Sequence, residues 1–295
     1  MILSSGKMLR PSLVILAGRY GRWEPGKILP LAAAVEMLHN ATLVHDDIID
    51  QASTRRGRPA LHEEMGSSTA VLVGDYLLSC CFTLTAGSTS ADNGIHLSRA
   101  VARICEGEIN QNAGRFVPDF SIRNYRRRIV GKTAALFSLS LLAGAREAGC
   151  SEADCSLFLR IGYDLGMAFQ IIDDILDYSG DDREVGKPLG KDLREGIYTL
   201  PLLLALKDDA GAQSGKDGPK GRAGNLEALV TSPPYDEKAT GEILRLTRER
   251  GGVEAARKEA WNYTLRAERE IARLSPGYTR DMLGWMAGHL FERNR

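Results

Sequence analysis

Residues 156–178 read SLFLRIGYDLGMAFQIIDDILDY. Apolar side chains recur at every third or fourth position of this stretch, which is the spacing of one face of an α-helix. Turn-forming clusters at 87–94, 180–190 and 232–235 separate it from other helical segments. Those segments, which share the same spacing, are 29–45, 69–86, 97–111, 122–145 and 252–274. Because alternating strand patterns are nearly absent, the sequence predicts an all-α fold, a helical bundle.

Length and composition restrict the classes of protein that fit. The chain has 295 residues, of which 43% are hydrophobic and 26% are charged, which excludes disorder over the whole chain. We expect a single domain over residues 1–295, with a flexible loop at 208–224, where the residues follow no period. Basic and acidic residues both number 38, so no overall basic field favours nucleic acid or an acidic membrane surface.

The cysteines and the N-terminal sequence bear on the cellular compartment. Five cysteines without paired CxxC spacing predict reduced, mostly buried thiols rather than a zinc site. The first residues lack a basic segment followed by an apolar stretch, and no uninterrupted apolar run approaches membrane-spanning length. We therefore expect a cytoplasmic protein whose contact with membranes is at most peripheral.

Two aspartate clusters have the same internal spacing. The first is His45-Asp-Asp-Ile-Ile-Asp50, and the second is Ile172-Asp-Asp-Ile-Leu-Asp177. In both clusters the first and last aspartates lie one helical turn apart and share a helix face. Ionised carboxylates among apolar neighbours lose several kcal/mol of hydration on burial unless they are paired or bind a cation.

A hard divalent cation would compensate for that cost. Mg2+ takes oxygen ligands and typically binds one or two carboxylates together with substrate phosphates. Two such clusters facing each other would hold one diphosphate. The alternative is that each cluster is a solvated helix face, or a first-turn group that the helix dipole favours. The equal spacing and equal apolar surroundings of both clusters favour the metal site.

Small cationic groups in the sequence suit additional phosphates. Arginine can bind phosphate oxygens in bidentate fashion and lysine supplies a point charge, so these groups fit a second diphosphate that the metal does not reach. Each group taken singly also fits a solvated surface. His39 lies about two turns before Asp46, near the same face, although a lone histidine is often structural. Tyr125 and Trp261 are expected in the core. The cationic groups are Lys7 and Arg10, Arg55 to Arg58, Lys132, and Lys187 and Lys191.

Taken in order, these motifs resemble those of the trans-isoprenyl diphosphate synthases, or polyprenyl synthetases. The resemblance runs from Gly6 to about Pro201, and the C-terminal helical pattern fits it loosely. It rests on GKMLRP at 6–11, HDDIID at 45–50, RRG at 55–57, KT at 132–133, FQIIDDILD at 169–177 and GKPLGKDL at 186–193.

The resemblance implies a fold, a reaction and a role for each matched residue. The fold would be a homodimer of all-helical subunits, each around a central cavity, and the reaction would join isopentenyl diphosphate head to tail to an allylic prenyl diphosphate. Mg2+ would be held by Asp46, Asp50 and Asp173, with Asp177 assisting through water. Isopentenyl diphosphate would contact Lys7, Arg10, His39 and Arg56. The allylic diphosphate would contact Arg55, Lys132, Gln170 and Lys187. Thr133 would sit beside the departing oxygen, and Thr133 and Gln170 are also candidates to stabilise an allylic carbocation.

Two departures from the family pattern stand out. The family usually has about one more helix before the Gly-Lys motif, so we expect that this sequence either begins late or is truncated by an N-terminal helix. Ile197 replaces a lysine that commonly follows Glu-Gly in the family, which removes one diphosphate contact. In the family, residues one turn before the first aspartates form the floor of the product tunnel. Ala41 and Thr42 are small there, which predicts a product longer than fifteen carbons, unless Met37, Leu38 or Phe82 closes the tunnel lower down.

Other functions fit the residues less well. A non-catalytic subunit of a two-component prenyl synthase would be expected to lack one aspartate cluster, and both are intact. A terpene cyclase or head-to-head condensing enzyme of similar fold would also ionise a prenyl diphosphate. A cyclase needs no isopentenyl diphosphate site, so the 6–11 segment, His39 and Arg56 favour chain elongation.

Overall fold

The computed structural model describes residues 8–179, 189–212 and 223–292, and they are mainly helical, which confirms the all-α prediction. The packing divides the chain into two compact units. The first comprises Met1–Val101, Leu136–Gly162 and Glu270–Leu283, and the second comprises Ala102–Ala135, Tyr163–Arg269 and Gly284–Arg295. The single domain over 1–295 stays a prediction. Of the expected loop at 208–224, residues 208–212 and 223–224 are helical, and the remainder lies outside the described residues.

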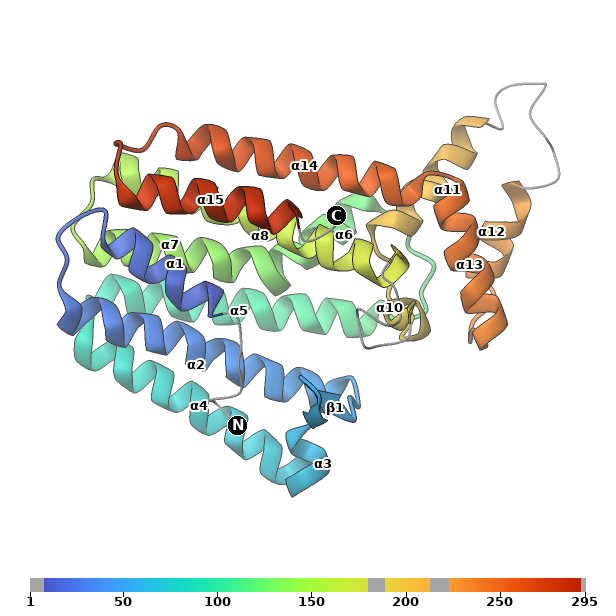
Figure 1. Ribbon diagram of the computed structural model, residues 1–295. Coiled ribbons are helices and arrows are strands. Elements are labelled where there is room, and N and C mark those ends of the chain that lie inside the picture. Colours follow the sequence, from blue (N-terminus) through green and yellow to red (C-terminus); the bar gives the residue numbers. More distant parts are fainter. Residues whose placement is uncertain (1–7, 180–188, 213–222, 293–295) are drawn as a thin grey trace. The chain divides into compact units, whose positions relative to one another are not determined.

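The first unit is built around two long helices that lie side by side, α2 and α4 (Figure 1). α2 begins with Pro25 at its first helical position, where the missing N–H of proline costs no hydrogen bond. A buried apolar cluster joins α1, α2, α4 and α7 through residues such as Val14, Leu38, Cys81 and Leu139. The elements of this unit are α1 (Leu9–Gly18), α2 (Pro25–Ile49), β1 (Thr54–Arg55), β2 (Arg58–Pro59), α3 (Leu61–Met65), α4 (Ser67–Ser88), the start of α5 (Ala91–Ala113), α7 (Ala135–Glu147), the start of α8 (Glu152–Ser179), the end of α14 (Gly252–Ile271) and the start of α15 (Tyr278–Glu292).

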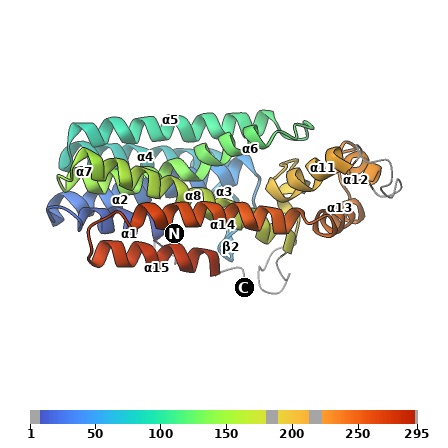
Figure 2. The ribbon, with the colours of Figure 1, turned by 90° about the horizontal axis from the view of Figure 1, so that it is seen from above.

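The second unit surrounds another apolar cluster, which includes Tyr125, Ile172, Tyr198 and Leu244. Three of its helices, α11, α12 and α13, lie together in both ribbon views (Figures 1 and 2). Its elements are the end of α5, α6 (Ile122–Ile129), the π-helical turn η1 (Val130–Ala134), the end of α8, α10 (Lys191–Arg194), α11 (Leu200–Ala212), α12 (Ala223–Val230), α13 (Glu237–Glu249), most of α14 (Gly252–Ile271) and the end of α15 (Tyr278–Glu292).

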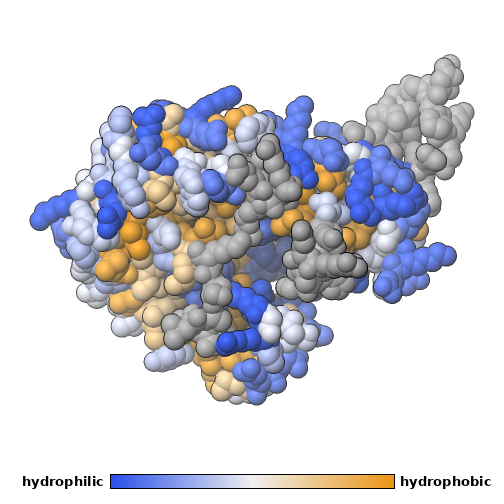
Figure 3. Space-filling view, viewed as in Figure 1, coloured by the Kyte–Doolittle hydropathy of each residue, from blue (hydrophilic) through white to orange (hydrophobic). Residues whose placement is uncertain are grey.

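Among the described residues, three helical stretches are long and apolar enough to cross a membrane by length and composition alone, although charged residues such as Asp75 and Lys132 interrupt their apolar runs. Two of them, Ile122–Glu147 and Glu152–Ser179, have apolar windows that are 78% and 67% buried, so the core uses most of their hydrophobicity. In α4 only 28% of the window is buried, and Leu72 and Tyr76 are 67% and 70% exposed. Figure 3 shows hydrophobic atoms at the surface over α4, along the lower edge of the view.

All five cysteines are free thiols, as the sequence predicts. Only Cys81 and Cys155 are buried, whereas Cys105 is exposed, so the expectation that most are buried was wrong.

Candidate active site

The first aspartate cluster lies at the C-terminal end of α2. Asp46 and Asp47 are in its last turn, and Asp50 is the residue that ends it, with its N–H donating to the Asp46 carbonyl oxygen at 2.8 Å. The C-terminal end of a helix carries roughly half a negative charge, which repels carboxylates. The first-turn alternative is therefore wrong for this cluster, because the helix dipole opposes it. A bound cation would offset that repulsion.

A β-hairpin after α2 places two of the predicted arginines. β1 and β2 pair antiparallel, with Arg55 opposite Arg58, so Arg56 and Gly57 form a two-residue turn. Their φ angles of 53° and 75° fit the tight turns that suit such hairpins, which require positive φ at both central residues. Glycine adopts this backbone freely, whereas Arg56 adopts it at a steric cost. The hairpin thus fixes where Arg55 and Arg56 project.

Arg55 reaches back from the hairpin to Asp47. Its Nε lies 2.9 and 3.0 Å from the two carboxylate oxygens of Asp47, and its Nη2 also contacts that carboxylate. Asp47 is 4% exposed, so this bidentate pair compensates its burial. Burial works against the charge of Arg55, but Asp47, Asp46 and Asp50 together raise its pKa. The predicted contact of Arg55 with an allylic diphosphate stays a prediction.

The structure brings together three of the residues predicted to hold isopentenyl diphosphate. Arg10 Nη1 lies 3.1 Å from His39 Nε2. Burial first, and then the charges of Arg10, Arg56 and Arg55, lower the pKa of His39 to about 3. His39 is therefore neutral at physiological pH, and its Nε2 accepts the hydrogen bond from Arg10. The fourth predicted residue, Lys7, lies outside the described residues.

In the second unit, Lys132 and Thr133 lie on the π-helical turn η1. Such turns widen a helix by one residue and are frequent at functional sites. Gly131 allows η1 to pack closely on α5, because a Cβ there would lie 2.9 Å from the Arg103 carbonyl oxygen and 3.3 Å from the Gly107 Cα. Lys132 Nζ lies 3.3 Å from a carboxylate oxygen of Glu108.

The second aspartate cluster occupies the last two turns of α8. The carboxylate of Asp177 accepts hydrogen bonds from the backbone N–H groups of Lys191 and Asp192, at 3.0 and 3.2 Å. Asp177 therefore positions the turn that begins α10, and its predicted metal role through water remains a prediction. Burial raises the pKa of Asp177, although these backbone hydrogen bonds oppose the shift. Lys187 lies outside the described residues.

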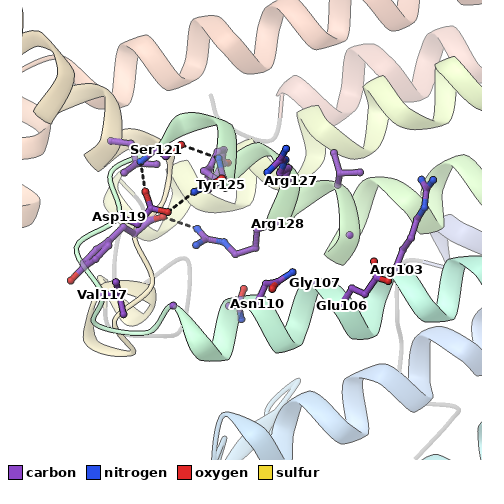
Figure 4. A pocket seen from close by; sticks show the side chains of 17 residues that line it. Arg103, Glu106, Gly107, Asn110, Val117, Asp119, Ser121, Tyr125, Arg127 and Arg128 are labelled. Atoms are coloured by element: carbon purple, nitrogen blue, oxygen red, sulfur yellow. Dashed lines mark hydrogen bonds between the residues drawn. The ribbon is translucent and has the colours of Figure 1, made fainter.

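Asp174, the middle aspartate of this cluster, was not among the predicted site residues. Its carboxylate accepts from Tyr125 Oη at 2.6 Å and from Gln170 Nε2 at 2.9 Å. Burial raises the pKa of Asp174 to about 6, against the effect of these two hydrogen bonds. Tyr125 and Arg128 line a cleft of about 580 Å3 between α5 and α6, opposite Gly107 (Figure 4). Tyr125 is buried as predicted, but its hydroxyl group reaches the aspartate cluster. The prediction that Trp261 lies in the core was wrong, because Trp261 is 39% exposed on α14.

Asp192 is a second residue that sequence analysis missed. Burial, and then the charges of Asp177 and Asp174, raise the pKa of Asp192 to about 8. Its position in the GKPLGKDL motif was a signal, because a buried carboxyl group in a cationic segment needs a partner. Ile197 is 7% exposed, and its N–H donates to the Asp192 carbonyl oxygen at 2.8 Å. The isoleucine thus packs inward at the position where the family commonly has lysine.

The donor chemistry fits a hard cation that is shared with phosphates. Within residues 8–179, 189–212 and 223–292, no three side chains of His, Cys, Asp and Glu converge closely enough to form a complete metal site. Mg2+ needs no such group when phosphates supply its other ligands. Both clusters lie in the last turns of their helices, where carboxylates are least favourable without a cation.

Comparison with known proteins places these residues in a family. The family model described as "Polyprenyl synthetase" matches residues 1–217. The chain belongs to the polyprenyl synthetase family. As a member of this family, it is a trans-prenyltransferase of isoprenoid biosynthesis. The resemblance that the motifs carry is therefore confirmed.

One curated relative and two solved structures illustrate the similarity. "Heptaprenyl diphosphate synthase component 2" of Bacillus subtilis is 33% identical over 293 residues, which are 99% of this chain and 80% of the relative. The crystal structure of heptaprenyl diphosphate synthase from Staphylococcus aureus has a TM-score of 0.90 at 29% identity, covering 99% of this chain and 88% of that one. A polyprenyl synthase from Caulobacter crescentus, complexed with calcium and isoprenyl diphosphate, has a TM-score of 0.86 at 34% identity, covering 99% and 86%.

Proposed function

We propose that this prenyltransferase condenses isopentenyl diphosphate with an allylic prenyl diphosphate, in the presence of Mg2+, to form a trans-polyprenyl diphosphate longer than fifteen carbons. The observation that carries the proposal is the pair of aspartate clusters at helix C-termini, within a chain of this family. The Caulobacter crescentus structure supports it, because that relative holds a divalent cation and an isoprenyl diphosphate.

Charge governs the chemistry that we propose. Bound Mg2+ would supply positive charge that neutralises the diphosphate of the allylic substrate. Lys132 would add a cation as the carbon–oxygen bond breaks and both electrons leave with the diphosphate. Arg10, Arg56 and neutral His39 would orient isopentenyl diphosphate. Its double bond attacks the allylic carbocation, and the proton then lost from the condensed product passes to the released diphosphate, so no protein base is needed.

The small side chains expected at the floor of the product tunnel favour a long product. Thr42 lies one turn before Asp46 and is half-buried, and its hydroxyl group donates to the His39 carbonyl oxygen at 2.8 Å. Ala41 is fully buried. Phe82, a candidate for a lower floor, is 38% exposed on α4 and does not fill the core of its own unit. The names of the Bacillus subtilis and Staphylococcus aureus proteins, both heptaprenyl synthases, also favour a long product.

Product analysis tests the reaction and the chain length together. Purified protein with MgCl2, farnesyl diphosphate and labelled isopentenyl diphosphate should yield products longer than fifteen carbons on chromatography. Thr42→Phe should shorten this distribution, whereas Thr42→Ser should leave it unchanged. Fifteen-carbon material as the sole end product from shorter primers would point instead to a farnesyl diphosphate synthase. Absence of isopentenyl diphosphate consumption would contradict the proposed reaction.

Carboxylate substitutions test the metal assignment. Asp46→Asn and Asp173→Asn should each reduce kcat at least about a hundredfold, because each removes a ligand charge at the diphosphate. Asp92→Asn, on the exposed start of α5, is the matched control and should keep wild-type activity. Unimpaired turnover in Asp46→Asn would rule out a metal role for that residue.

We further propose that the protein acts in the cytoplasm as a homodimer, with α4 at the interface. The support is the exposed apolar side of α4, since exposed apolar patches on soluble proteins usually mark contact surfaces. The Bacillus subtilis relative is named as one component of its synthase, so a different partner chain is the alternative.

A further inference from the structure

Three hydrogen bonds connect α6, α8 and η1 in one chain within the second unit. Tyr125 Oη donates to Asp174 Oδ2 at 2.6 Å. Gln170 Nε2 donates to Asp174 Oδ1 at 2.9 Å, and Thr133 Oγ1 donates to Gln170 Oε1 at 2.6 Å. Tyr125, Asp174 and Thr133 are 2%, 3% and 4% exposed, so water competes little for these groups.

The direction of every bond in this chain follows from Asp174. A carboxylate only accepts hydrogen bonds, so the groups that face it from Tyr125 and Gln170 must both donate. The amide of Gln170 is thereby oriented with its nitrogen toward Asp174 and its oxygen toward Thr133. That oxygen accepts the single hydroxyl hydrogen of Thr133, which leaves only oxygen lone pairs on the other side of Thr133.

The first member of the chain is itself held in place. The guanidinium of Arg128 lies 5.5 Å from the centroid of the Tyr125 ring, and its Nη2 donates to the Tyr198 carbonyl oxygen at 2.6 Å. In Figure 4, the side chain of Arg128 projects from α6 into the cleft. The Tyr125 hydroxyl is therefore fixed against Asp174 by contacts outside the aspartate cluster.

We propose that Tyr125 and Asp174 are positioning residues that orient Gln170, so that Thr133 presents an oxygen lone pair, and not its proton, to the allylic carbon. The inference rests on the prenyl transfer proposed above. Thr133 could either donate a hydrogen bond to the departing oxygen or stabilise the carbocation. The inference favours the second role, because a hydroxyl group that donates to Gln170 has no hydrogen left for the departing oxygen. As the carbon–oxygen bond breaks, positive charge develops on the allylic carbon, and the lone pair stabilises it.

An exchange of charge between two positions provides the central test. In Asp174→Asn, the buried Tyr125 hydroxyl keeps its hydrogen-bond acceptor when the oxygen of the introduced amide faces it. The nitrogen of that amide then faces Gln170, which turns its own oxygen toward the nitrogen. The Gln170 nitrogen then donates to Thr133 and reverses the polarity there. Adding Gln170→Glu restores a carboxylate that accepts from both the introduced amide and Thr133. Asp174→Asn should lower kcat about tenfold with little change in KM, and the double variant should recover most of the loss.

A binding measurement detects, without turnover, whether Thr133 presents its oxygen lone pair or its hydrogen to the ligand. The probes are an allylic ammonium diphosphate, whose nitrogen carries the positive charge, and its uncharged carbon isostere, titrated calorimetrically with MgCl2 present. Wild-type protein should prefer the cationic probe. Asp174→Asn should reduce this preference about tenfold, and Asp174→Asn with Gln170→Glu should restore it. An unchanged preference in Asp174→Asn, or a double variant no better than the single one, would overturn the proposal.

A pair of tyrosine substitutions covers the case in which Asp174→Asn does not fold. Tyr125→Phe keeps the ring but leaves Asp174 with one donor fewer, so it should reduce kcat and the cationic preference by a smaller factor. Tyr198→Phe is the matched control, since its hydroxyl group is buried in the same cluster but bonds to Tyr235 at 2.9 Å. Equal values of kcat and of the cationic preference in the two variants would show that Tyr125 does not position Gln170. A wild-type protein that does not consume isopentenyl diphosphate would instead contradict the proposed function, whatever the variants show.

Discussion

His39 is neutral in the folded protein because it is buried next to Arg10, Arg56 and Arg55, which lower its pKa from 6.5 to about 3. The unfolded chain takes up a proton on this histidine below pH 6.5, whereas the folded chain does not do so until the pH approaches 3. The stability that His39 contributes is therefore complete above pH 6.5 and is lost as the pH falls. Between pH 7 and pH 5 the loss is about 2 kcal/mol.

His39→Gln should remove this part of the pH dependence. Glutamine offers an oxygen that can accept from Arg10 but does not titrate, so the unfolding free energy should fall less between pH 7 and pH 5 than in the wild type. Denaturant titrations at both pH values measure the difference. A wild-type slope in His39→Gln would show that His39 protonates equally in both states.

Single residues also show where sequence reasoning reached its limit. The spacing of Asp46 and Asp50 was readable because a helix of known period fixes which positions share a face. The sequence did not predict the pairing of Asp47 with Arg55, because this pairing depends on a hairpin with strands of two residues. So short a hairpin leaves almost no alternating pattern. Tyr125 was placed in the core from its neighbours, but which group its hydroxyl meets depends on how α6 packs on α8.

At the scale of the element, η1 shows why helix bounds were predicted better than helix geometry. The segment 122–145 was predicted as one helix, and the chain is helical from Ile122 to Glu147. Within it, residues 130–134 form a π-helical turn. Over five residues the spacing of apolar positions does not distinguish an α-helix from a π-helix. The close approach of Gly131 to Gly107 required the neighbouring helix to be known.

Gly131→Ala should destabilise the protein and disturb Lys132. In a helix interior, alanine is normally favoured over glycine by about 1 kcal/mol. Here the new methyl group would lie 2.9 Å from the Arg103 carbonyl oxygen, so α5 and η1 must separate, at a cost of about 1–3 kcal/mol. Thermal unfolding should show a lower midpoint, and kcat should fall because Lys132 moves with η1.

Gly241→Ala is the matched control within the same unit. Gly241 lies inside α13, and a Cβ there meets no atom within 4 Å. Its replacement should raise the unfolding midpoint, because only the helix preference acts. A rise of the same size in Gly131→Ala would mean that the close approach of Gly131 to Gly107 does not hold α5 and η1 together.

At the scale of the whole molecule, the exposed apolar side of α4 calls for a partner. Leu72 and Tyr76 lie one helical turn apart and are 67% and 70% exposed. A second copy of the chain, an unrelated subunit and a membrane would each cover such a surface. Asp75 and other polar residues share the helix, and the surface hydrophobicity is therefore interrupted, which fits a protein contact better than a lipid one.

A charge on this surface should separate the subunits. Leu72→Lys with Tyr76→Lys places two ammonium groups where apolar side chains of the proposed homodimer would be desolvated. Light scattering after size exclusion should therefore report a dimer for the wild type and a monomer for the double variant. Leu159→Lys, at a position 42% exposed on α8, controls for the added charge and should stay dimeric. Wild-type protein that is monomeric and gains activity only with a second component would favour the heteromeric assembly. Monomeric wild-type protein that binds neutral vesicles would assign α4 to a membrane, since an apolar helix face gains free energy from burial in lipid much as it does at a protein interface.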